Sequence, residues 1–155
     1  MVAKDRRSLP EGGAAPTTKQ QPAMSPPDAA AASTPELSSV TRVVVGEKDT
    51  VGAMVPGMPY VAATPYLVAV AELACADLVR GLLEPGQITV GSRVVIDHLG
   101  PSKVGAALVV KAALASREKN RFRFTVRIED GDRVVATVEH VRAAVSLQKI
   151  MSALG

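Results

Sequence analysis

The chain has very little with which to form disulfides or to bind nucleic acid. Its 155 residues include one cysteine, no tryptophan, two phenylalanines and two tyrosines, and the net charge is only +3. A single cysteine excludes a disulfide framework within the chain and suits a reducing cytoplasm. The weak positive charge and the shortage of aromatic side chains for base stacking argue against nucleic acid as a partner.

Long apolar runs are also missing. The longest one, Pro65–Ala76, contains Glu72 and is followed by Asp77. It is therefore too short for a membrane span, which needs roughly 18 apolar residues. The basic residues near Met1 are not followed by an apolar segment, so no secretory signal is expected. We expect a cytoplasmic protein without a membrane partner.

Composition divides the chain into two parts. Residues 1–38 are rich in Pro, Ala, Gly, Ser, Thr and Gln and contain almost no large apolar residue. Such a segment cannot form a packed core, so residues 1–38 are predicted to be a disordered tail. Residues 39–155 are predicted to form one domain.

One long helix is predicted from about Thr64 to Leu83. Thr64 and Pro65 are typical of a helix start, and Glu84-Pro85-Gly86 is typical of a helix end. A helix that is apolar nearly all round is expected to be buried. Glu72 is the one charge in its apolar run, and a buried carboxylate is costly unless it is paired. Glu72 is either a functional acid or a residue on a narrow solvent-facing stripe.

The rest of the domain reads as strands. Alternating or continuous apolar patterns predict them at residues 40–45, 88–98, 104–116, 121–128 and 133–147, with a short helix at 148–154. In the second segment, one face should carry Ile88, Val90, Val94, Ile96 and His98. The segment at 104–116 is so apolar that other parts of the protein are expected to cover both of its faces. One long helix and an antiparallel sheet suit an α+β hot-dog fold, and the apolar surface left over favours a homodimer.

Few residues in this layout can do chemistry. His98 is in phase with the apolar face that should cover the helix, so it and Glu72 could meet in a dry site as base and partner. Each has a simpler explanation, since a lone His on such a face is usually a core residue. Thr64 could simply cap the helix, and Gly91 could mark a bulge or the close approach of a ligand.

Several motifs resemble the fluoroacetyl-CoA-thioesterase-like family of hot-dog proteins. They are Ala63-Thr64-Pro65-Tyr66-Leu67-Val68-Ala69, Glu72, Leu83-Glu84-Pro85-Gly86-Gln87, Thr89-Val90-Gly91-Ser92 and His98-Leu99. Asp49-Thr50 and Met54-Val55-Pro56-Gly57 resemble the family's lead-in to the helix. The resemblance spans roughly residues 40–150.

The resemblance implies hydrolysis of an acyl-CoA thioester. The family's catalytic threonine, glutamate and histidine fall on Thr64, Glu72 and His98. Its glycine, whose amide would contact the acyl carbonyl, falls on Gly91, and its late His-Glu-Arg segment makes Arg142 a candidate for substrate binding. No metal or redox cofactor is implied, because CoA enters as part of the substrate.

Two departures from the family keep other functions open. The segment Leu99-Gly100-Pro101-Ser102-Lys103 differs from the family's usual loop, and the middle glutamate of His-Glu-Arg is replaced by Val141. Of the aromatic lid found in fluoroacetyl-specific members, only Tyr60 remains, so fluoroacetyl selectivity is not inferred. The alternatives are a non-catalytic acyl-CoA-binding module and a hot-dog enoyl-CoA hydratase or dehydratase.

Overall fold

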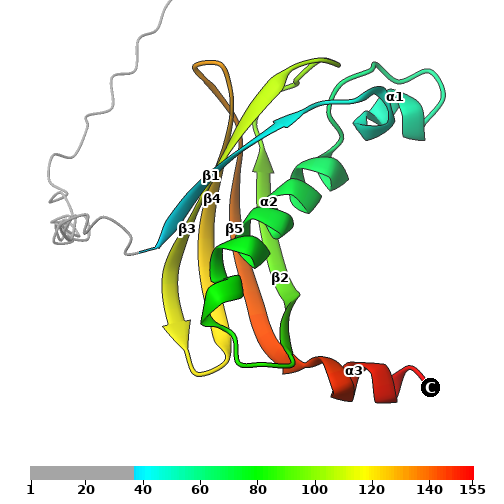
Figure 1. Ribbon diagram of the computed structural model, residues 1–155. Helices are drawn as coiled ribbons and strands as arrows, with labels where there is room; N and C mark the ends of the chain where they lie inside the picture. The colour runs from blue at the N-terminus through cyan, green and yellow to red at the C-terminus, as the bar shows by residue number, and fades with distance from the viewer. Residues whose placement is uncertain (1–36) are drawn as a thin grey trace, which may run out of the picture. The chain divides into compact units, whose positions relative to one another are not determined.

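The computed structural model describes residues 37–155 of the chain. The predicted disordered tail falls almost wholly on residues 1–36, outside the described residues. Five strands and one long helix make up the domain (Figure 1), in the chain order β1 (Ser38–Val44), α2 (Thr64–Val79), β2 (Gln87–His98), β3 (Ala107–Glu118), β4 (Arg121–Asp130) and β5 (Arg133–Ser146). The short helices are η1 (Glu47–Asp49), α1 (Val51–Met54), η2 (Arg80–Leu82) and α3 (Leu147–Ala153).

The five strands form one antiparallel sheet in the order β1-β3-β4-β5-β2. Helix α2 crosses one face of this curved sheet (Figure 1). The arrangement confirms the predicted α+β architecture of one helix covered by an antiparallel sheet. Among residues 37–155, β1 and β2 each pair with a single strand, so they are the two edges of the sheet.

The core lies between α2 and the sheet. Strand β4 supplies Phe122, Phe124, Val126 and Ile128, all buried, while its alternate residues are exposed, as the period of two predicted. Each of these large side chains contributes about 1.5–3 kcal/mol by leaving water. Helix α2 buries Leu67, Val70, Ala71, Ala74, Cys75 and Val79 against them. In the described part of the chain, no helix is long and apolar enough to cross a membrane.

Strand β3 departs from prediction. Its alternate residues Leu108, Val110 and Ala112 are buried, but Lys111 between them is exposed on the other face. The expected cover on both faces is therefore wrong for the described residues. The outer face of β3 carries small side chains that look apolar in sequence but need little cover.

The predicted faces of β2 are correct only for its second half. A bulge lies between Gly91 and Arg93, where Gly91 pairs with Arg142 while Arg93 pairs with Val141. The extra residue reverses which side chains face the helix. Val94 and Ile96 pack on the core as predicted. In the first half, Thr89 and Gly91 share the face of Arg142, and Ile88 and Val90 do not join the core.

Candidate functional site

Thr64 and His98 meet where helix α2 begins and strand β2 ends. The Thr64 Oγ1 and His98 Nδ1 atoms are 2.8 Å apart, and His98 Nε2 lies 3.1 Å from the backbone oxygen of Gly100. A carbonyl oxygen can only accept, so Nε2 carries the proton and Nδ1 accepts from the Thr64 hydroxyl. Both side chains are exposed.

The Thr64 hydroxyl is not a helix cap. Residue Ala63 occupies the N-cap position and makes no side-chain cap bond, and Thr64 is the first helical residue with Pro65 following it. Its hydroxyl is therefore free of the backbone and bonds His98 instead. The simpler of the two explanations of Thr64 is wrong.

Glu72 lies near the middle of α2, and its side chain is 41% exposed. Its Oε1 atom is 3.6 Å from His140 Nε2 and 3.8 Å from Arg142 Nη1. The carboxylate therefore has a cation beside it and an open side toward solvent. Glu72 occupies a half-exposed stripe and also meets buried polar groups, and its role as a functional acid stays a prediction.

Gly91 makes room for this carboxylate. A Cβ atom on Gly91 would stand 2.2 Å from Glu72 Oε1 and 3.1 Å from His140 Cε1. Contacts that short require the neighbour to move. Gly91 therefore shows both features that the sequence predicted as alternatives: it adjoins a bulge, and another group approaches it closely. In this structure that group is the Glu72 side chain.

Arg142 is buried, with 7% of its surface exposed. Its Nε donates to Thr89 Oγ1 at 3.0 Å and its Nη2 to the backbone oxygen of Thr89 at 2.9 Å. Its Nη1 lies 3.1 Å from His140 Nε2 and 3.4 Å from the backbone oxygen of Glu72. The guanidinium is fixed on three sides by protein acceptors.

His140 is almost fully buried, at 1% exposure. Its Nδ1 lies 3.0 Å from the backbone oxygen of Arg93, so this nitrogen carries the proton and Nε2 is left to accept from Arg142. Burial lowers the pKa of His140, and the nearby Arg142 charge lowers it further, against the opposing effects of the Arg93 carbonyl and Glu72. His140 is therefore held neutral.

The structure thus gathers the predicted residues into two clusters. The first is Thr64 with His98, and the second, which we call the Arg142 cluster, comprises Thr89, Gly91, His140 and Arg142 around Glu72. Among the described residues, no hydrogen bond or ion pair joins Glu72 to His98 or Thr64, so the expected meeting of acid and imidazole does not occur within one chain. Thr64 and Glu72 are eight residues apart in sequence, and a helix rises about 1.5 Å per residue, so about 12 Å along the axis separates them.

Two members of the Arg142 cluster, His140 and Thr89, were missed by sequence reasoning, whereas Arg142 was already a candidate through the family resemblance. His140 and Arg142 are in phase with the buried Val138 and Ala144 on β5, and two polar side chains in phase with a core face are a usable signal. Thr89 gave no signal, because only the bulge turns it toward the helix.

Other reactive groups lie outside these two clusters. Burial raises the pKa of the Cys75 thiol to about 12, so Cys75 is an unreactive core residue. Among residues 37–155, no group of three or more His, Cys, Asp and Glu side chains could hold a metal ion. A groove of about 610 Å³ opens on the face of the sheet away from α2, between residues such as Lys111, Arg127 and Glu139, and none of the predicted site residues lines it.

Comparison with known proteins gives a consistent result. The family described as fluoroacetyl-CoA-specific thioesterase matches residues 45–148 of this chain. The fluoroacetyl-CoA thioesterase of Streptantibioticus cattleyicolor is 32% identical over 91 residues, which cover 59% of this chain and 66% of that protein, slightly less than two thirds of its length.

Solved structures agree. A mutant of the fluoroacetyl-CoA-specific thioesterase, in complex with fluoroacetate and CoA, superposes with a TM-score of 0.68 at 28% identity, covering 73% of this chain and 95% of that one. A hot-dog-like protein from Thermanaerovibrio acidaminovorans superposes with a TM-score of 0.68 at 20% identity, covering 77% of this chain and 90% of that one, and supports the fold. The fold is the hot-dog fold, and this chain belongs to the fluoroacetyl-CoA-specific thioesterase family.

Proposed function

We propose that this protein is an acyl-CoA thioesterase that hydrolyses a small or short-chain acyl-CoA to the free acid and CoA. The observation that carries the proposal is the placement of Glu72, a half-exposed carboxylate seated against Gly91 and beside the buried Arg142. A helix acid with one open side can activate water, and the family relationship supplies the thioester as its target. The reaction needs no metal or redox cofactor, since CoA enters as part of the substrate.

Each site residue has a role in this proposal. Glu72 takes a proton from water, and the resulting hydroxide attacks the thioester carbonyl carbon. The backbone N–H of Gly91 and the Arg142 side chain hold the acyl group, so that charge on the carbonyl oxygen is stabilised as it develops. Thr64 positions the water or the carbonyl. The proton that Glu72 took from water passes to His98, which delivers it to the departing CoA sulfur as the carbon–sulfur bond breaks, so both residues return to their starting states.

A homodimer would bring the two clusters together. In the described residues, β2 is an edge strand that carries Gly91 near its start and His98 at its end, and α2 leaves Leu73 65% exposed. Pairing two copies of β2 antiparallel about a two-fold axis midway between residues 91 and 98 places His98 of one copy opposite the partner subunit's Gly91. Each site would then combine Glu72 of one chain with Thr64 and His98 of the other.

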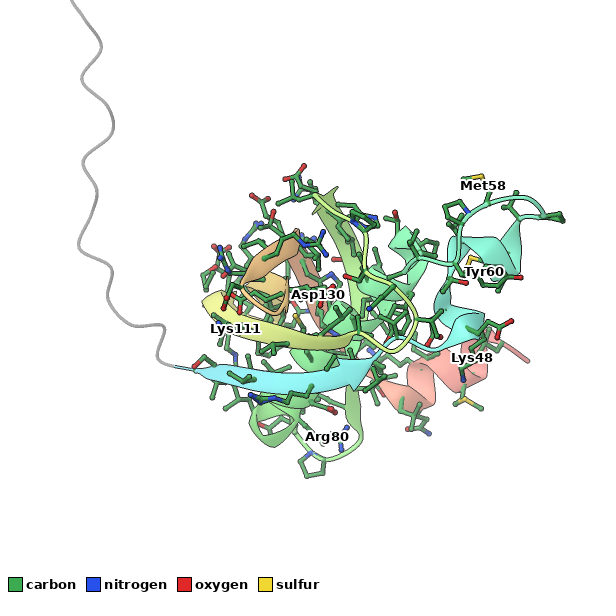
Figure 2. The ribbon with its side chains drawn as sticks, turned by 90° about the horizontal axis from the view of Figure 1, so that it is seen from above. Lys48, Met58, Tyr60, Arg80, Lys111 and Asp130 are labelled. Carbon is green, nitrogen blue, oxygen red and sulfur yellow. The ribbon has the colours of Figure 1, made fainter. Side chains whose placement is uncertain are left out.

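The loop before α2 offers little aromatic cover in a single chain. Figure 2 shows Met58 and Tyr60 on the loop before α2, on the side of the domain away from Lys111 and Asp130. Both are exposed. With Tyr60 as the one aromatic in that loop, we propose a small acyl group without fluoroacetyl selectivity, acted on in the cytoplasm.

The test is purified protein with a panel of acyl-CoAs, followed by thiol release. Replacing Glu72→Gln should lower kcat about 100- to 10,000-fold, the usual contribution of a general base. The matched control is Asp77→Asn, which removes an exposed carboxylate of the same helix that pairs with Arg80, and it should keep full activity. Full activity in both Glu72→Gln and His98→Ala would exclude the site.

The same panel separates the alternatives. Loss of the double bond from an enoyl-CoA without thiol release would indicate a hydratase, and saturable CoA-ester binding without either reaction would indicate a binding module. For the thioesterase, single turnover in ¹⁸O-water separates two pathways. Label in the Glu72 carboxylate means that Glu72 attacked the carbonyl directly and formed an anhydride. Because water attack on the acyl carbon of such an anhydride labels only the product acid, trapping of a labelled acyl group on Glu72 is tested as well, and water attack is concluded only if Glu72 carries neither label.

A further inference from the structure

The guanidinium of Arg142 makes more hydrogen bonds within the protein than a residue that only binds substrate would need. It donates to Thr89 twice, through Nε to Oγ1 at 3.0 Å and through Nη2 to the backbone oxygen at 2.9 Å. A guanidinium group that makes two hydrogen bonds to the same residue cannot rotate freely. The bonded edge of the guanidinium therefore faces β2, and Nη1 is left to face the helix.

His140 fixes the remaining nitrogen. Because its Nδ1 donates to the backbone oxygen of Arg93, its Nε2 lone pair points at Arg142 Nη1, 3.1 Å away. The ring is also tilted against Phe124, with centroids 6.3 Å apart, so it has no freedom to turn. Nη1 is thereby held 3.8 Å from Glu72 Oε1.

Glu72 itself has few constraints from its own helix. Its side chain is 41% exposed, and apart from the Gly91 backbone its polar neighbours among the described residues are His140 and Arg142, both from β5. A half-exposed glutamate left alone samples several rotamers. The direction of its carboxylate therefore depends on where the guanidinium stands.

We propose that Thr89 and His140 are positioning residues: they hold Arg142, and through it they aim the Glu72 carboxylate. The inference rests on the proposed thioesterase function, since the aim of Glu72 matters for turnover. Thr89 accepts from Arg142 at the side chain, so its hydroxyl is specifically required. His140 is required as a neutral acceptor.

A buried arginine could also be held in this way only to satisfy its hydrogen bonds. The two roles differ in what a mild substitution changes. A structural role alters stability and leaves kcat unchanged in the folded protein, whereas a positioning role lowers kcat while KM changes little.

The main variant is Thr89→Val, which removes the hydroxyl and keeps the shape of the side chain. Loss of a residue that orients a catalytic group typically costs about 10- to 100-fold in activity, so we expect kcat to fall about tenfold with KM within about twofold. Thr89→Ser should restore most of the activity, and Thr125→Val, on the exposed face of β4, is the control for the substitution itself.

A second pair tests His140. His140→Gln can present an oxygen near the place of Nε2 and should stay within a few-fold of wild type, whereas His140→Leu should match Thr89→Val or fall below it. Melting temperatures are measured for all variants, and the assays are run well below the lowest one.

A readout that does not need turnover keeps the two proposals separate. In protein with ¹³C-labelled glutamate carboxyls, the Glu72 resonance is identified by its loss in Glu72→Gln and is compared at one pH in wild type and in Thr89→Val. A changed chemical shift or a broadened line in Thr89→Val, with Thr89→Ser like wild type, supports positioning even if no acyl-CoA is hydrolysed, in which case the thioesterase proposal alone fails. An unchanged Glu72 resonance and an unchanged kcat in a folded Thr89→Val protein would overturn the positioning role.

Discussion

The two histidines of this chain face the same side of the sheet but are held in opposite ways. His98 is exposed, protonated on Nε2 and accepts from the Thr64 hydroxyl, while His140 is buried, protonated on Nδ1 and accepts from Arg142. The difference comes from which ring nitrogen meets a backbone carbonyl. The exposed histidine can exchange a proton with substrate, and the buried one is a fixed acceptor.

In the proposed homodimer, the exposed His98 of one chain serves the buried cluster of the other, so the two clusters should act in trans. Mixing the inactive variants Glu72→Gln and His98→Ala under subunit exchange should restore about a quarter of wild-type activity, because half the dimers are hybrids and each hybrid has one intact site. Thiol release after mixing measures this. If the clusters act within one chain, the mixture stays inactive, and the composite site is wrong.

Gly91→Ala should damage the buried cluster while leaving the exposed one intact. The added methyl would overlap Glu72 Oε1 and push the carboxylate away. A displacement of about 1 Å at a catalytic group can cost about 100-fold, so a loss of about 10- to 100-fold in kcat is expected. Gly81→Ala is the control, since nothing lies within 4 Å of a Cβ atom there. Equal activity in the two variants would contradict the close contact between the Glu72 carboxylate and Gly91.

The buried histidine should also make stability depend on pH. The folded pKa of His140 is lowered, so the unfolded chain binds a proton first as the pH falls. Stability should therefore be greatest above the unfolded value of about 6.5 and decrease as the pH drops below it. Urea unfolding at pH 7 and pH 5 tests this. His140→Gln should lose less stability over this interval than wild type, and an equal loss would argue against a buried neutral histidine.

The smallest expected effect is a difference in tautomer between His98 and His140 in the wild-type protein. With only two histidines in the sequence, ¹⁵N spectra of the imidazoles at neutral or higher pH should show one ring protonated on Nε2 and the other on Nδ1. The His98→Ala variant identifies which is which. Two rings in the same tautomer would mean that one of the carbonyl contacts is wrong.

Local patterns in the sequence predicted most of the fold. The Thr64-Pro65 start and the alternation of β4 depend on neighbours in the chain, and the structure shows both of them. The outer face of β3 was misjudged because small alanine side chains count as apolar and still tolerate solvent.

The site was harder to predict because its contacts join distant segments. The helix start at Thr64 and the inward face of His98 followed from helix and strand patterns, but the contact between these two residues was not predicted. The partner of Glu72 was not predicted either, because it depends on residues of β5 about seventy positions away and on the register of β2. A bulge moves side chains between faces without an unambiguous sequence signal, so Thr89 could not be assigned.

The extra residue in β2 divides that strand into two segments of opposite phase. The segment ending at His98 turns Val94 and Ile96 toward the helix, and the segment before Gly91 turns Thr89 toward Arg142. Removing one residue at Ser92 would leave the strand length almost unchanged and yet rotate Thr89 out into solvent and Ile88 inward. In aligning relatives of this chain, a single gap at this point therefore distinguishes proteins that can build the Arg142 cluster from proteins that share only the fold.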